Sequence, residues 1–262
     1  MFAFHPPPEK NYTGMDTGTW PEGIRYEHHY KDGIPHGKWT EWSETKEYGV
    51  KKVSEKNYKD GEPHGIDAEW DISGIFIKET NWKNGKIDGK SITMNYKRFF
   101  IGNIRTYQKE SEGNWKDGKR DGKQSKWYWD LDQIESEVNC KDGKRDGMTI
   151  RWHRNGRIES LANYKDGKLV GRKTAWHENG QMKAEGNYKD GKQDGNAIFW
   201  HENGQKQSER NWKEGKRDGK MIFWDENGQI DSEAYWKDNE CISGDCELVK
   251  HLSLINREMG GI

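Results

Sequence analysis

The sequence has no long apolar run, no recognisable secretion signal and no excess of basic residues. No stretch approaches the roughly 18 consecutive apolar residues that a membrane-spanning helix needs. Residues Met1–Glu9 have no basic start followed by an apolar segment, so we expect no Sec signal. The 44 Lys and Arg residues are balanced by 45 Asp and Glu. This balance argues against a general nucleic-acid binder, and we expect no nucleic-acid partner.

Cysteine is also scarce. Cys140, Cys241 and Cys246 are the three cysteines of the chain. Because the set is small and odd, we expect no disulfide framework and a reducing, cytoplasmic environment. Cys241 and Cys246 have no matching Cys or His pair, so the sequence predicts no zinc site.

The composition is polar but not that of a disordered chain. Only 30% of residues are hydrophobic, 34% are charged, and the mean hydropathy is −1.30. Disordered chains combine such polarity with few aromatics and a large net charge. Here the net charge is −1 and aromatics make up 12% of residues, with 14 Trp and 11 Tyr. We therefore expect a folded chain with a thin, aromatic core.

One phrase recurs along the chain: an aromatic residue, Lys, an acidic residue or Asn, Gly, three further residues and a second Gly. It first appears at His29–Gly37, is regular from Asn114–Gly122 to Asn211–Gly219, and is degenerate at Tyr235–Gly244. The last three intervals between first glycines are all 24 residues, and Asn239 takes the glycine position 24 residues further on in the degenerate copy. Self-similarity at a fixed period is typical of repeat architectures.

A second phrase, Trp-His-x-Asn-Gly or a variant, lies between the copies. The Asn-Gly pairs indicate tight turns in which both central residues have positive φ, and the Lys-Asp-Gly-Lys phrase indicates a second turn. Each unit therefore has two turns and two strands. The sequence predicts an all-β fold: an elongated, solenoid-like, open antiparallel meander of tandem β-hairpins.

Alternation along the strands predicts one packed face. In one strand Ile198 and Trp200 share a face, and in the strand before it Ala184, Gly186 and Tyr188 share a face. We expect these sets on the same packed side. The opposite, polar side would carry glutamates in register (Glu79, Glu159, Glu185, Glu209 and Glu233). Residues recurring at fixed slots are expected to form a structural aromatic ladder (Trp70, Trp152, Trp176, Trp200, Trp224, Tyr164, Tyr188 and Trp212).

Three segments depart from the repeat. Residues 1–22, with three consecutive prolines, are expected to form a tail or cap, and residues 23–245 the array of about nine units. An insertion lies near 95–103. Helical spacing relates four apolar residues near the C-terminal end: Leu248, Leu252, Ile255 and Met259. This spacing predicts that residues 246–262 form a short capping helix over an open sheet edge.

The two phrases together resemble the MORN repeat, and most of all its bacterial variant with Asn-Gly-Gln turns. The resemblance covers about residues 26–240. It implies a β-hairpin array that serves as a scaffold for protein or lipid contacts, and some bacterial members are described as antitoxins. Others carry a lipid-kinase name, but this chain has neither a phosphate-cradling Gly loop with its Lys nor a catalytic Asp followed by Asn.

The sequence offers no catalytic, metal or cofactor site. The Asp-Gly-Lys-Arg-Asp-Gly turns lack the alternating oxygen ligands that calcium requires. His153, His177 and His201 recur one repeat apart, which is several times too far to share one metal ion. The acidic and basic residues recur once per unit, as structural positions do. We therefore expect a protein that is not an enzyme and has no cofactor.

An apolar strip stands out near the C-terminal end. If the Trp side is packed, Phe199, Met221 and Phe223 are exposed and form a candidate protein-binding surface, unless the C-terminal helix covers them. Phe99 and Phe100 in the insertion form a second candidate contact. The leading hypothesis is a protein-binding scaffold, with a toxin or the subunits of a larger complex as partner. The alternatives are a glycan-binding or cell-wall module, and weak membrane-lipid binding through turns whose charges nearly cancel.

Overall fold

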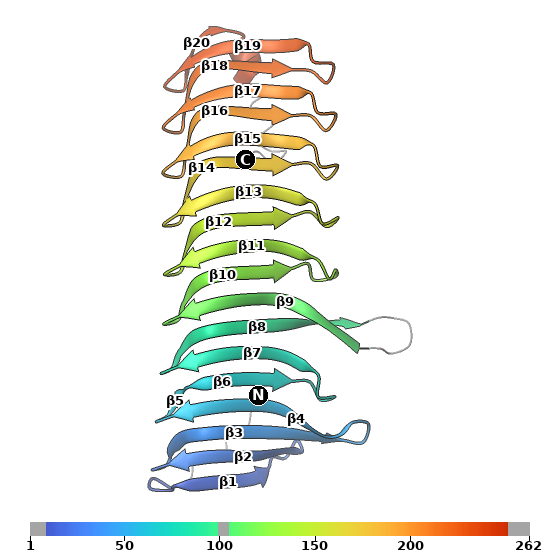
Figure 1. Ribbon diagram of the computed structural model, residues 1–262, viewed down its shortest axis with the longest axis vertical. Helices are drawn as coiled ribbons and strands as arrows, with labels where there is room; N and C mark the ends of the chain where they lie inside the picture. Colours follow the sequence, from blue (N-terminus) through green and yellow to red (C-terminus); the bar gives the residue numbers. More distant parts are fainter. Residues whose placement is uncertain (1–8, 99–104, 251–262) are drawn as a thin grey trace. The chain divides into compact units, whose positions relative to one another are not determined.

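A computed structural model describes residues 9–98 and 105–250, which fall into two units, 1–132 and 133–262. The described residues are almost entirely β, and all strand pairs are antiparallel (Figure 1). The N-terminal unit contains β1 (Gly14–Thr19), β2 (Ile24–Lys31), β3 (Ile34–Thr45), β4 (Gly49–Lys59), β5 (Glu62–Pro63), β6 (Gly65–Trp70), β7 (Phe76–Lys83), β8 (Lys86–Arg98), β9 (Arg105–Lys116) and β10 (Lys119–Trp127).

The C-terminal unit repeats one hairpin with little variation. It contains β11 (Ile134–Lys141), β12 (Lys144–Trp152), β13 (Ile158–Lys165), β14 (Lys168–Trp176), β15 (Met182–Lys189), β16 (Lys192–Trp200), β17 (Lys206–Lys213), β18 (Lys216–Trp224), β19 (Ile230–Lys237) and β20 (Glu240–Gly244). Within each unit the strands follow one another as a meander, which confirms the predicted fold class. Residues 246–250 form one short helical turn.

The two turns of the repeat use different backbone geometry. In the Lys-Asp-Gly turn both central residues have positive φ, as in Asp190 (52°) and Gly191 (84°), which is the type I′ pattern. In the Asn-Gly turn only the glycine does. There the Gly180 amide donates to the His177 carbonyl at 2.9 Å and the His177 amide to the Gln181 carbonyl at 2.9 Å. This is a three-residue loop, so the expectation of positive φ at both residues of the Asn-Gly turns was wrong.

The segments that depart from the repeat extend the sheets. Residues 14–19, expected in a tail or cap, form β1 and pair with β2. The insertion near 95–103 lengthens the β8–β9 hairpin, in which Arg98 pairs with Arg105. Phe99 and Phe100 lie outside the described residues, and so do residues 251–262 of the predicted capping helix. The structure therefore describes only residues 246–250 of the helix that was predicted after the array.

The pairing register corrects the predicted faces. Ala184 pairs with Phe199 and Gly186 with Ala197, so these four residues share one side of the sheet. Ile198 pairs with Glu209 and lies on the other side. The expectation that Ile198 and Trp200 share the side of the small residues was therefore wrong. We call the side with Ala184, Gly186, Ala197, Ser208 and Arg210 the small-residue face, and the side with Ile198, Glu185, Glu209 and the repeat tryptophans the Trp–Glu face.

Burial is greatest on the small-residue face. Ala184 is 2% exposed, Ala197 1% and Ser208 0%. Near the end of the C-terminal unit a compact cluster forms from Met221, Phe223, Ala234, Trp236 and Val249, with Trp212 and Cys241 packed against it. Val249 belongs to the helical turn, so this turn covers the end of the small-residue face.

A disulfide fixes that turn to the sheet. Cys241 in β20 is bonded to Cys246, the first residue of the helical turn, whereas Cys140 is a buried free thiol. The sequence-based expectation of no disulfide was therefore wrong for this pair. Because two of the three cysteines form a disulfide, the cysteine content no longer argues for a reducing compartment.

Candidate functional site: the two faces of the C-terminal unit

The Trp–Glu face is occupied by its own charged groups. In the repeat that contains β17, the Lys206 ammonium lies 2.9 Å from the Glu209 carboxylate and 5.6 Å from the ring centre of Trp224. The N-terminal unit repeats this arrangement: the Lys52 ammonium lies 2.8 Å from Glu55 and 4.3 Å from the ring centre of Trp70. Each cation thus covers an indole and neutralises a carboxylate, so the charges in these repeats of the Trp–Glu face are already balanced.

One predicted glutamate does not belong to that row. Leu161 pairs with Ile150 and takes the position that Glu185 and Glu209 occupy in later repeats. Glu159 lies two residues earlier, at a register shift, where its carboxylate is 3.4 Å from the Arg151 guanidinium. The expectation that Glu159 is in register was therefore wrong.

The histidine and asparagine ladders connect successive repeats. The imidazoles of His153, His177 and His201 lie 2.8, 3.0 and 3.2 Å from the carbonyl oxygens of Trp176, Trp200 and Trp224. The Asn179 side-chain amide donates to the Glu202 carbonyl at 2.8 Å, and Asn155 and Asn203 make the same bond in their repeats. These residues hold turns together. Among the residues that the structure describes, no group of three His, Cys, Asp or Glu side chains could hold a metal ion.

The predicted apolar strip divides into buried and accessible parts. Met221 is 0% exposed and Phe223 3%, because Val249 packs on them, so they do not form an exposed surface. This is the alternative in which the C-terminal helix covers them. Phe199 stays half-buried on the small-residue face. The eight residues of the predicted aromatic ladder are also half-buried, but Tyr188 and Trp212 lie on the small-residue face and Trp200 and Trp224 on the other.

Unpaired polar atoms gather on the small-residue face. In the described part of the chain, the Arg210 Nη2 and the Trp212 indole nitrogen are buried without a hydrogen-bond partner. Burial raises the pKa of Tyr188 to about 12, while the neighbouring Gln193 acts in the opposite direction. Buried donors without acceptors are rare in folded proteins. The sequence could not reveal these unpaired donors, because whether a buried donor finds an acceptor depends on how the strands pair.

The N-terminal unit carries an aromatic cluster on β1 to β4. The His28 imidazole stacks on the Trp39 indole with ring centres 3.9 Å apart and an interplanar angle of 8°. Tyr30 and Tyr58 pack on Trp39 at 5.2 and 4.9 Å. Burial and the nearby Asp16 carboxylate raise the pKa of Tyr30 to about 12. The rings mainly cover one another, so this cluster acts as a small core for the sheet.

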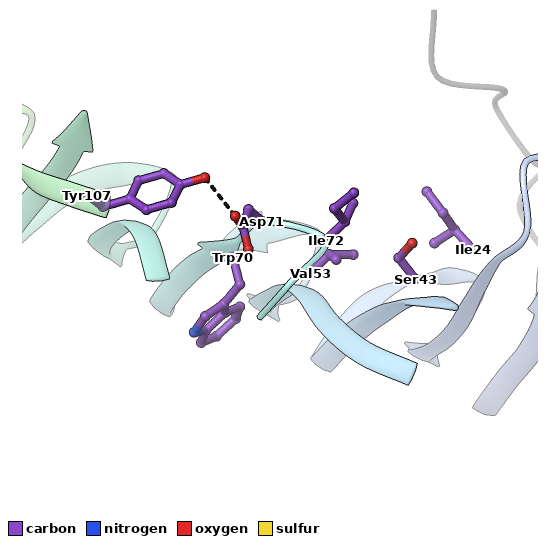
Figure 2. Close-up of a pocket in the computed structure, with 7 residues that line it drawn as sticks. All are labelled: Ile24, Ser43, Val53, Trp70, Asp71, Ile72 and Tyr107. Carbon is purple, nitrogen blue, oxygen red and sulfur yellow. Dashed lines mark hydrogen bonds between the residues drawn. The ribbon is translucent and has the colours of Figure 1, made fainter. Parts of the chain in front are cut away.

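A shallow hollow of about 500 Å³ lies in the same unit. Figure 2 shows its seven lining residues, with Tyr107 reaching towards Asp71. The Tyr107 hydroxyl donates to one Asp71 oxygen at 2.7 Å, and the other oxygen accepts from the Ser73 amide, the Ser73 hydroxyl and the Ile75 amide. This carboxylate is fully used in fixing a turn, and the remaining lining is mostly apolar, so the hollow offers no acid–base pair.

The three most regular repeats match a known family model. Residues 169–190, 193–214 and 217–238 match the MORN repeat variant. MORN repeats are typically modules that bind proteins or membrane lipids. No curated protein matches the chain as a whole. No helix among the described residues is long and apolar enough to cross a membrane.

Proposed function

We propose that this protein is a non-catalytic scaffold that binds a protein partner on the small-residue face of its C-terminal unit. The observation that carries the proposal is the contrast between the two faces of β16. On one side, Ile198 lies among Lys–Glu pairs and cation-covered indoles. On the other, Phe199 is half-buried beside buried donors that have no acceptors. An accessible aromatic side chain on a face without matched ion pairs suits a partner better, because aromatic residues are enriched in the cores of protein interfaces.

The proposed biological form is an antitoxin or immunity protein, or a subunit of a larger complex. Such a protein acts by occluding or positioning its partner, and it needs no catalytic residues. The match to the MORN repeat variant supports a binding role and is compatible with this form. Action in the cytoplasm stays a prediction, to be tested by cell fractionation.

Two adjacent residues of β16 provide a matched test. Phe199→Ala and Ile198→Ala each truncate one half-buried apolar side chain, on opposite faces. Tagged wild-type protein and both variants are used to capture partners from native lysate, with mass spectrometry of the eluates. We expect one stoichiometric protein to be lost with Phe199→Ala and retained with Ile198→Ala. Equal capture by all three proteins would contradict the choice of face.

Two further assays separate the other binding classes. Pelleting with anionic liposomes tests membrane lipid, and quenching of Trp fluorescence by glycans tests a carbohydrate ligand. Lipid or glycan binding without any protein partner would overturn the proposal.

A further inference from the structure

The C-terminal end of the described chain folds back over the small-residue face. We call residues 246–250, which form the helical turn after β20, the C-terminal latch. The route of the chain is set at Gly244, where φ is 89° and an added Cβ would lie 2.8 Å from the Ala234 Cα. The chain therefore passes close to β19 at this point. Beyond it, Val249 of the latch packs on Met221 and the neighbouring apolar cluster.

The latch is held to the sheet by the Cys241–Cys246 bond and by the packing of Val249. Of residues 246–250, only Val249 is buried. The hydrogen bond from the Val249 amide to the Asp245 carbonyl, at 2.9 Å, closes the helical turn itself. Because a single helical turn is not stable on its own, one apolar side chain is a weak anchor for it. The covalent bond is therefore what keeps the latch closed.

The disulfide lies where a reductant can reach it. Both of its cysteines are half-buried, and the four residues between them, 242–245, are exposed. Exposed disulfides are typically the labile or regulatory ones. In a reducing compartment such bonds are usually transient, and they often act as redox sensors.

The latch covers apolar side chains that continue the surface around Phe199. Met221, Phe223 and Trp236 are buried beneath it. Ser208 pairs with Phe199 on one side and with Phe223 on the other, so the two phenylalanines share one row, about 9–10 Å apart. Opening of the latch would therefore extend the accessible aromatic surface from Phe199 to Phe223 and Trp236.

We infer that the C-terminal latch is a redox switch on the partner-binding face, closed while Cys241 and Cys246 form a disulfide and open when they are thiols. This inference rests on the proposed function and adds its regulation. The reductant is a dithiol: one of its thiolates attacks a protein sulfur, the S–S bond breaks, and the other cysteine leaves as a thiolate that takes up a proton. The second thiolate of the reductant then displaces the first cysteine, which is protonated in turn. Two electrons thus pass from the reductant, which becomes a disulfide, to the protein, which holds two thiols.

The test compares the oxidised full chain with the same protein after reduction by dithiothreitol and alkylation of the thiols. Both samples carry Cys140→Ser, so that the buried free thiol takes no part. Hydroxyl-radical footprinting with mass spectrometry measures how accessible each side chain is. Loss of a cross-link with a sequence separation of 5 favours the open latch roughly thirtyfold in the chain-entropy model, so we expect the modification of Met221 to rise several-fold. Met148 is exposed already and should not change.

Cys246→Ser opens the latch by a second route, without reductant or alkyl group. Hydrogen exchange of β18 and β19 in this variant shows whether the sheet beneath stays folded, as we expect. The inference is wrong if Met221 is modified at the same rate in the oxidised, reduced and Cys246→Ser proteins. It is also wrong if dithiothreitol leaves the disulfide of the native protein intact. Loss of protection throughout β18 and β19 would show that the bond holds the sheet rather than the latch.

Partner capture separates this inference from the proposed function. We expect the reduced protein to capture more partner from native lysate than the oxidised protein does, and Phe199→Ala to abolish capture by both. Equal capture by the two forms, still lost with Phe199→Ala, would leave the scaffold function standing and refute the switch. If Met221 becomes accessible on reduction but neither form captures a protein, the scaffold function fails while the opening of the latch stands.

Discussion

The guanidinium of Arg210 lies between the rings of Phe199 and Phe223, 4.4 and 5.0 Å from their centres, and no carboxylate of the described residues forms an ion pair with it. Two opposing effects meet here. Each of the two ring contacts stabilises a desolvated cation by about 2 kcal/mol. Burial lowers the pKa of this guanidinium from its ordinary value to about 10, which corresponds to a desolvation penalty of about 3 kcal/mol. The two effects are therefore of similar size.

We predict that Arg210→Met leaves the free protein as stable as the wild type or stabilises it by about 1 kcal/mol, because an unpaired buried charge is replaced by an apolar side chain of similar length. Urea denaturation of both proteins measures this difference. The unfolded state holds more protons at this site when the pH rises above the folded pKa of about 10, so the wild type should gain stability there and the variant should not. A strongly destabilised variant would show that Arg210 is a structural cation.

The Cys241–Cys246 bond should stabilise the end of the C-terminal unit. It closes a loop with a sequence separation of 5, for which chain entropy suggests about 2 kcal/mol. We expect Cys246→Ser to lower the stability of this unit by that amount and to expose Met221 and Phe223 by loosening Val249. Calorimetry with and without reductant tests this, with Cys140→Ser as the control. Three titratable thiols in the unreduced, denatured chain would contradict the pairing.

The Lys-Asp-Gly turns should be sensitive to residue type at their first central position. Asp190 has a φ of 52°, where a β-branched side chain is strained by about 1–2 kcal/mol. We predict that Asp190→Val destabilises the protein by that amount, whereas Asp190→Asn is neutral, since Asn84 already occupies the equivalent place at a φ of 49°. Equal denaturation midpoints for the two variants would show that the turn geometry is not the deciding factor.

The Asp71 carboxylate should titrate below its ordinary range. Burial alone would raise the pKa of Asp71, but hydrogen bonds from Ser73, Tyr107 and the Ile75 amide outweigh it and lower the pKa. Its contribution to stability is therefore complete above the unfolded pKa of about 3.9. It is lost as the pH falls through the lower folded value.

Tyr107→Phe removes one of those hydrogen bonds. We expect the pKa of Asp71 to rise in this variant and acid unfolding to begin at higher pH, as followed by carboxyl NMR. Asp225 is an internal control, because its turn is held by the Asn227 and Gln229 amides without a tyrosine. A shift of both carboxylates would indicate a general loss of structure.

The repeat was readable from the sequence, but its faces were not. The Lys-Asp-Gly and Asn-Gly phrases locate the turns of the hairpins because turn chemistry is local. The side that Trp200 faces depends on the three-residue loop and on the register shift between Phe199 and Trp200. Alternation within one strand reveals neither of these features. Likewise, the unpaired donors of Arg210 and Trp212 become visible only once the cross-strand neighbours are known.

Site-specific photo-cross-linking from β16 tests the central claim most directly. A photoreactive phenylalanine analogue is placed at Phe199 in one protein and at Ile198 in another, and each is irradiated in native lysate. We predict a cross-link to one protein from position 199 and none from position 198. A cross-link from position 198 alone would place the partner on the Trp–Glu face and contradict the account.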